Sequence, residues 1–202
     1  MYARVIFSQY RPEQTDEVIR LYRESVVPEQ RKQHGFKGVM VLNDRAAGKG
    51  FSITFWETEA DLQASDQISP YYQQQMTKFA TYFTAPPVRE AYEVSVQQVQ
   101  EGRTPLYARV ITFQLQPGKI DTWTQIAREA VGPVARQQQG YKGILSLIDK
   151  SANKIIGISL WETEAAMQAG ERSSYVQEQL ARVAPVLTAP PVQAAYEVSI
   201  QA

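Results

Sequence analysis

The sequence predicts an α+β fold in which one module occurs twice. The segment YARVI at residues 2–6 recurs at 107–111, an offset of 107 − 2 = 105, and WETEA at 56–60 recurs at the same offset. The segment TAPPV at 84–88 recurs after 188 − 84 = 104 residues, so one residue is missing before the second Pro-Pro pair. Self-similarity at a nearly constant offset indicates two copies of one structural unit.

The repeats divide the chain into two expected domains. We expect the first repeat at residues 1–98, a linker at 99–105 and the second repeat at 106–202. The linker is polar and contains Gly102 and Pro105, residue types that interrupt regular structure.

Each repeat begins with a strand and an amphipathic helix. Residues 2–9 are rich in β-branched and aromatic side chains, which favours a strand. After Pro12, apolar and small residues recur at helical spacing, and they are Val18, Leu21, Tyr22, Ser25 and Val26. We expect Pro28 and Pro133 to kink this helix and Gly35 and Gly140 to end it in a left-handed cap.

A hairpin, a broken helix and a last strand follow. Residues 36–42 and 51–56 read as paired strands around a loop. Thr58 and Asp61 form a capping box for a short helix, and Ser69-Pro70 begins a second one. An Ala-Pro-Pro loop then leads into a strand at 91–96, or 195–200 in the second repeat. The order β-α-β-β-α-β is the ferredoxin-like plan.

A ferredoxin-like sheet carries helices on one face and leaves the other face bare, and a bare apolar face needs cover. We therefore expect the two sheets to pack face to face within one chain, as an intramolecular pseudo-dimer that forms a barrel. Whether two such chains also form a homodimer is left open by the sequence.

Strand alternation gives each strand an apolar side and a mixed side. We expect the helices to cover the apolar side, which includes Ala3, Val5 and Phe7, and the mixed side to line a space between the sheets. The mixed side supplies the candidate ligand contacts, which are Arg4, Ser52, Thr54, Trp56 and Glu93 in the first repeat and Arg109, Ser159, Trp161 and Glu197 in the second.

These residues allow two interpretations. An arginine beside a tryptophan suits a flat anionic or phenolic ligand. Alternatively, Arg4 pairs with Glu93 and Arg109 with Glu197, because buried charges need partners, and the tryptophans anchor the core.

Composition excludes several classes of function. The 21 basic and 21 acidic residues cancel, so a nucleic-acid partner is not expected. The chain has no cysteine and a single histidine, His34, which we expect to cap a helix, so no metal site is expected. No glycine-rich phosphate loop follows a strand, and we expect no cofactor. Neither a signal region nor an 18-residue apolar span is present, so we expect a cytoplasmic protein without a membrane partner.

Residues 55–60 and 160–165, FWETEA and LWETEA, resemble the Trp-Glu-Ser/Thr signature of the antibiotic-biosynthesis-monooxygenase-like domains in the dimeric α/β-barrel superfamily. The order of elements fits the same family in both repeats. The resemblance implies a cofactor-independent monooxygenase, a haem-degrading enzyme or a member without known activity.

The resemblance also implies functional residues that this chain lacks. Quinol-type members carry an asparagine four residues before the tryptophan, where this chain has Ser52 and Gly157. Haem-degrading members carry an asparagine on the first strand and a histidine ten residues past the tryptophan. At the histidine position this chain has Asp66 in the first repeat and Glu171 in the second. Its asparagines, Asn43 and Asn153, fall in the expected hairpin loops and not on the first strand. Haem cleavage and a chlorite-dismutase-like role are therefore not expected.

Two functions remain open. One is a cofactor-independent monooxygenase that acts on or binds a small aromatic or phenolic ligand. The other is a non-catalytic small-molecule-binding or stress-associated module. The repeats differ at Ser52/Gly157, Phe7/Thr112 and Val18/Trp123, so we expect unequal half-sites.

Overall fold

The computed structural model describes residues 1–67, 70–99, 105–131, 135–172 and 174–202. The chain forms two compact units, one of Met1–Glu93 with Glu197–Ala202 and one of Val94–Tyr196. The expected linker at 99–105 falls outside the described residues except for its two ends.

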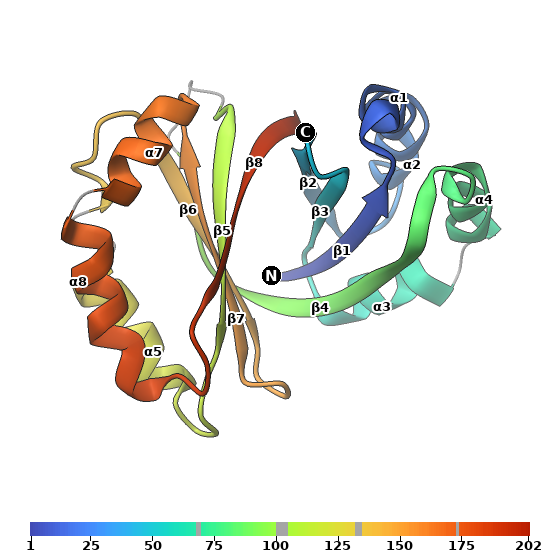
Figure 1. Cartoon of the computed structure of the whole chain (residues 1–202). Helices are drawn as coiled ribbons and strands as arrows, with labels where there is room; N and C mark the ends of the chain where they lie inside the picture. Colours follow the sequence, from blue (N-terminus) through green and yellow to red (C-terminus); the bar gives the residue numbers. More distant parts are fainter. Residues whose placement is uncertain (68–69, 100–104, 132–134, 173) are drawn as a thin grey trace. The chain divides into compact units, whose positions relative to one another are not determined.

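The first unit contains a sheet with helices on one side (Figure 1). Its elements are β1 (Tyr2–Tyr10), η1 (Pro12–Gln14), α1 (Thr15–Leu21), η2 (Tyr22–Val26), α2 (Val27–Gln30), β2 (Phe36–Asp44), β3 (Lys49–Trp56), α3 (Glu59–Gln67), α4 (Pro70–Phe79) and the first part of β4 (Phe83–Val99). The segment η2 is π-helical. It ends at Val26, two residues before Pro28, where a kink was expected.

The second unit repeats this order, and its helices α5 and α8 lie on one side of its sheet (Figure 1). Its elements are β5 (Tyr107–Gln114), α5 (Ile120–Ile126), the π-helical η3 (Ala127–Val131), β6 (Tyr141–Asp149), β7 (Lys154–Trp161), α7 (Glu164–Arg172), α8 (Ser174–Val183), η4 (Ala184–Val186) and β8 (Val192–Gln201). Pro133 lies outside the described residues.

The described strands follow the hydrogen-bonded order β1-β3-β2-β8-β5-β7-β6-β4, which closes as a barrel. In each unit the central pairings are antiparallel, and β3 lies between β1 and β2 as β7 lies between β5 and β6. The predicted α+β class, with two ferredoxin-like repeats forming a dimeric α/β barrel in one chain, is confirmed.

The predicted local signal for the start of helix α3 is confirmed. Thr58 and Asp61 form the predicted capping box, since Asp61 N–H donates to Thr58 Oγ1 and Thr58 N–H donates to Asp61 Oδ2, both at 3.1 Å. The Thr58 hydroxyl, which donates to Asp61 Oδ2, and His34 lower the pKa of the Asp61 carboxyl.

The expectation that Gly35 ends the first helix in a left-handed cap is wrong, because α2 ends at Gln30 and its cap residue Arg31 is right-handed. Gly35 and Gly140 lie in the turns before β2 and β6 with φ of +73° and +77°, where a Cβ is strained. No helix among the described residues has the length and apolar character to cross a membrane.

The strand β4 is longer than expected. The sequence predicted an Ala-Pro-Pro loop before a strand at 91–96, but β4 already begins at Phe83. Its pairing with β1 changes register between Phe7 and Tyr10, so the prolines fall at an irregularity in the ladder. A bulge tolerates proline because the ladder hydrogen bonds are already interrupted there.

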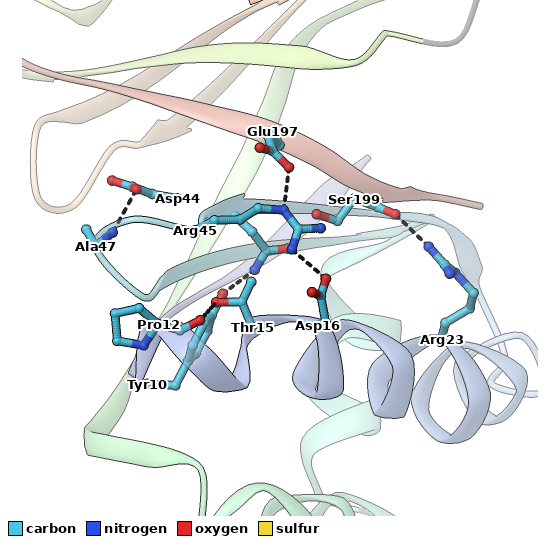
Figure 2. Close-up of polar contacts among 11 residues, drawn as sticks. Tyr10, Pro12, Thr15, Asp16, Arg23, Asp44, Arg45, Ala47, Glu197 and Ser199 are labelled. Atoms are coloured by element: carbon cyan, nitrogen blue, oxygen red, sulfur yellow. Dashed lines mark hydrogen bonds and ion pairs between the residues drawn. The ribbon is translucent and has the colours of Figure 1, made fainter.

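The end of β8 completes the first unit. Its residues pair with β2 from Asn43↔Glu197 to Met40↔Gln201. Figure 2 shows the polar contacts that hold this segment: Arg45 bonds to both Glu197 and Asp16, and Arg23 donates to the Ser199 carbonyl at 2.9 Å. The end of the last strand of the second repeat is therefore part of the first unit.

Candidate functional site

Each unit contains a cavity between its sheet and its helices. In the first unit Arg4, Ser52, Thr54 and Trp56 line the cavity together with helix residues such as Tyr22. In the second unit Arg109, Ser159 and Trp161 do so, opposite Trp123 and Ala127. The structure thus brings seven of the nine candidate residues into two cavities, and neither Glu93 nor Glu197 is among the described lining residues.

The expected assignment of the strand faces is wrong. The mixed face lies under the helices, whereas the prediction placed it on the opposite side of the sheet. The apolar face is also buried, with Ala3, Val5 and Ile53 at 0% exposure. Because both faces are buried, apolar character does not show which face the helices cover. The face under the helices carries polar side chains because it borders a cavity, and ligand cavities contain a few polar groups.

An arginine lies over a tryptophan in each cavity. The Arg4 and Arg109 guanidinium carbons both lie 5.6 Å from the indole centroids of Trp56 and Trp161, within cation–π distance. Both arginines are buried, at 8% and 3% exposure.

The tryptophans also have structural contacts. Trp56 packs edge-to-face on Phe36 and Trp161 on Tyr141, with centroids 5.8 Å apart in each pair. The Trp56 indole N–H donates to Thr54 Oγ1 at 3.1 Å, and that of Trp161 donates to Ser159 Oγ at 2.9 Å. The indoles both anchor the core and border a cavity.

The expected pairing of Arg109 with Glu197 is wrong. Arg109 Nε donates to Glu171 at 2.8 Å, and Nη2 donates to the Met167 carbonyl. Burial lowers the pKa of Arg109 and Glu171 opposes this shift, but a guanidinium stays charged. Glu197 instead pairs with Arg45 at 2.6 Å, because the end of β8 lies beside β2.

In the first unit, Arg4 Nη2 donates to the Leu62 carbonyl at 2.6 Å and to Ser65 Oγ at 2.7 Å. The β1–β4 register places Ala91 opposite Arg4 and Glu93 opposite Tyr2. Helix α3 therefore supplies contacts to Arg4 that strand alternation alone could not predict.

The two cavities differ in size, as expected from the differences between the repeats. The cavity of the first unit measures ≈ 100 Å³ and that of the second ≈ 580 Å³. Cavities that hold drug-sized ligands measure about 300–1,000 Å³. Only the second cavity falls in this range.

Sequence reasoning missed several lining residues. Tyr22 was assigned to a helix face but not to the site, although it lies beside Ser52 and Gln30 in the first cavity. Asn43 was expected in a loop, but it is the penultimate residue of β2, is 2% exposed and donates to the Tyr10 hydroxyl. The expectation for Asn43 is therefore wrong.

Two buried polar atoms in the wall of the larger cavity have no hydrogen-bond partner among the described residues. They are Trp123 Nε1 and Ser146 Oγ, whose residues are 6% and 4% exposed. An unsatisfied buried donor or hydroxyl is costly unless a ligand or water occupies the cavity.

His34 does not contribute to either cavity. Its ring is 94% exposed, and Nδ1 lies 2.7 Å from Asp61. In the described part of the chain no group of three or more histidine and carboxylate side chains is placed to hold a metal ion.

Comparison with known proteins identifies relatives of uncharacterized function. Two uncharacterized proteins of Mycobacterium tuberculosis (strain ATCC 25618 / H37Rv) are 32% identical over 77 residues and 38% identical over 64 residues. These alignments cover 38% and 32% of this chain and 33% and 29% of the relatives. The match thus spans about a third of the length of the curated relatives.

Solved structures share the fold over nearly the whole chain. A candidate monooxygenase from Fusobacterium nucleatum has a TM-score of 0.77 at 9% identity, covering 99% of this chain and 93% of that one. An anthrone oxidase-like protein has a TM-score of 0.74 at 16% identity, with 100% and 92% covered. The haem-degrading enzyme LmHde from Listeria monocytogenes has a TM-score of 0.53 at 12% identity, with 96% and 99% covered.

The family assignment follows from the sequence of both repeats. The model of the antibiotic biosynthesis monooxygenase family matches residues 1–78 and 106–182, which together exceed half of the chain. The protein therefore belongs to the antibiotic biosynthesis monooxygenase family, with one family domain in each repeat.

Proposed function

We propose that the second repeat binds a flat anionic or phenolic aromatic molecule in its cavity and oxygenates it with molecular oxygen, without a cofactor. The observation that carries this proposal is the cavity of ≈ 580 Å³ with the buried guanidinium of Arg109 over the indole of Trp161.

The walls suit an aromatic ring system. Phe113, Trp123 and Trp161 supply aromatic surface, and Ile111 and Leu180 supply aliphatic surface. Aromatic and aliphatic walls with a few placed polar groups are typical of small-molecule sites.

The charges favour an anion. Arg109, Arg128 and Arg136 all line the cavity, and its described lining contains no carboxylate, imidazole or lysine. Arg109 uses Nε and Nη2 to bind Glu171 and the Met167 carbonyl, and we propose Nη1 as its donor to a ligand oxygen. A preorganised donor in a site that excludes water stabilises a phenolate or enolate more strongly than water does.

The same residues limit the chemistry. With no base among the described lining residues, the substrate proton passes to water, and Arg109 stabilises the anion that remains. For an anthrone, the ring methylene loses two hydrogens, one oxygen atom becomes the new carbonyl and the other leaves as water. The two C–H bonds of the substrate supply all four electrons that reduce molecular oxygen, so no external reductant is required.

The test uses anthrones and hydroquinones. An oxygen electrode measures oxygen uptake, and quenching of tryptophan fluorescence measures binding. We expect Arg109→Gln to weaken binding about 10- to 100-fold, because it removes a charge-assisted hydrogen bond of about 1.5–3 kcal/mol. The equivalent change Arg4→Gln serves as the comparison and is expected to leave affinity within about two-fold, because the first cavity is below the size range for such ligands.

The lack of a base among the described residues that line the cavity also favours the second candidate, a binding module without catalysis. Tight binding with no oxygen uptake above buffer, while the Arg109→Gln effect persists, would select the binding module. If no planar aromatic anion binds, or if Arg4→Gln and Arg109→Gln weaken binding equally while both variants melt cooperatively, the proposed site is incorrect.

A further inference from the structure

The two repeats differ in the residue that begins each π-helical segment. Tyr22 begins η2 and Ala127 begins η3, and 127 − 22 = 105 is the offset that relates Arg4 to Arg109 and the two tryptophans. Both residues line their cavities. A π-helical turn is frequent at functional sites, and here it places the same position against the cavity in both repeats.

Tyr22 contributes a phenol to the wall of the first cavity. Its hydroxyl accepts a hydrogen bond from Gln30 Nε2 at 3.2 Å, and it also bonds to Ser52 near the charge of Arg4. Its ring packs on Phe79, with centroids 6.3 Å apart. Burial raises the pKa of Tyr22, and its hydrogen bonds and Arg4 oppose this shift. The phenol is therefore neutral at physiological pH.

The second repeat lacks the side chains that place this phenol. Ala127 replaces Tyr22, Ala135 replaces Gln30 and Gly157 replaces Ser52, all at the offset of 105. Arg109 and Trp161 remain. The space that opens contains the unpartnered Trp123 Nε1 and Ser146 Oγ, so the wall offers a ligand two polar contacts besides Arg109.

We propose that Tyr22 is an intramolecular occupant of the first repeat: its phenol takes the position in the first cavity that the ligand takes in the second cavity. The chain then has one ligand site, and the small side chain of Ala127 keeps that site open. This inference rests on the proposed function. It specifies the ligand further as an aromatic with one phenolic oxygen toward Arg109 and a second oxygen that accepts from Trp123 Nε1.

The first test measures binding stoichiometry by calorimetry with 1,8-dihydroxyanthraquinone, which carries several oxygens and is not oxidised. The unmodified chain of 202 residues is expected to bind one molecule. Ala127→Tyr is expected to abolish detectable binding, a loss of more than about 100-fold, whereas Ala127→Ser is expected to retain it. Binding of the probe by folded Ala127→Tyr with unchanged affinity overturns the role of Ala127.

The second test is independent of the unidentified ligand. Tyr22→Ala should leave a cavity of phenol shape that p-cresol refills, since apolar cavities in proteins bind matching aromatic molecules. We expect p-cresol to raise the melting temperature of Tyr22→Ala but not of Tyr22→Phe, which keeps the ring in place. Equal responses of the two variants, both with cooperative melts, overturn the assignment of Tyr22 as an occupant.

The two tests separate the possible failures. If the chain binds no planar aromatic but p-cresol rescues Tyr22→Ala, the proposed function fails while the occupant role of Tyr22 stands. If 1,8-dihydroxyanthraquinone binds with a stoichiometry of two, the first cavity opens to ligand and the inference fails while the proposed function stands.

Discussion

Replacing Gly48 with alanine is expected to destabilise the first unit by at least about 3 kcal/mol, because backbone strain and a clash combine. Gly48 has φ +62°, and a Cβ there would lie 2.1 Å from the Tyr10 carbonyl oxygen. Its own carbonyl accepts from Tyr10 N–H at 2.8 Å, so the turn cannot move away without losing that bond. Urea unfolding followed by circular dichroism measures the loss.

Gly118 provides a matched control. It has φ +75°, but a Cβ there would meet no atom within 4 Å. Gly118→Ala should therefore cost only the strain of the left-handed conformation, about 1–2 kcal/mol. If the two variants lose the same stability, the close approach of Gly48 to the Tyr10 carbonyl does not contribute.

Much of the fold could be predicted because local signals agreed in both repeats. The alternation in β1 and β3, the capping box at Thr58 and the left-handed conformation of Gly35 and Gly140 each depend on a few neighbouring residues. The start of β4 could not be predicted, because its prolines are typical of loops and only the pairing with β1 shows that they fall at a bulge. The pairing of β8 with β2 depends on contacts between distant segments, which residue periodicity does not encode.

Seven of the nine candidate residues line the two cavities, but the side of the sheet on which the cavities lie was not predicted. Strand alternation correctly grouped Arg4 with Ser52, Thr54 and Trp56, because residues on one face of neighbouring strands must lie together. It could not show that the helices cover this face. The role of Tyr22 was missed for the same reason, although the substitution of Tyr22 by Ala127 was visible in the repeat alignment and was the signal that could have found it.

Removing residues 197–202 is expected to unfold the first unit while the second unit retains its structure. The deletion removes the β2–β8 ladder, the paired bonds between Val39 and Ala202, and Ile200, which is 6% exposed in the cluster of Ile19, Val27, Val39 and Val41. Loss of a buried isoleucine costs about 2–5 kcal/mol, and each lost backbone hydrogen bond about 0.5–1.5 kcal/mol. The total reaches the whole stability of a typical domain, about 5–15 kcal/mol.

Hydrogen exchange read by mass spectrometry distinguishes the units, because β2 and β3 should lose protection in the shortened chain whereas β6 and β7 should keep it. Ile200→Ala is the graded control, since it removes one core side chain and keeps the ladder and the Arg45–Glu197 pair. It should lower stability without abolishing protection in β2. Wild-type protection of β2 in the shortened chain would show that the first repeat folds without the end of β8. The β2–β8 pairing would then not determine the stability of the first unit.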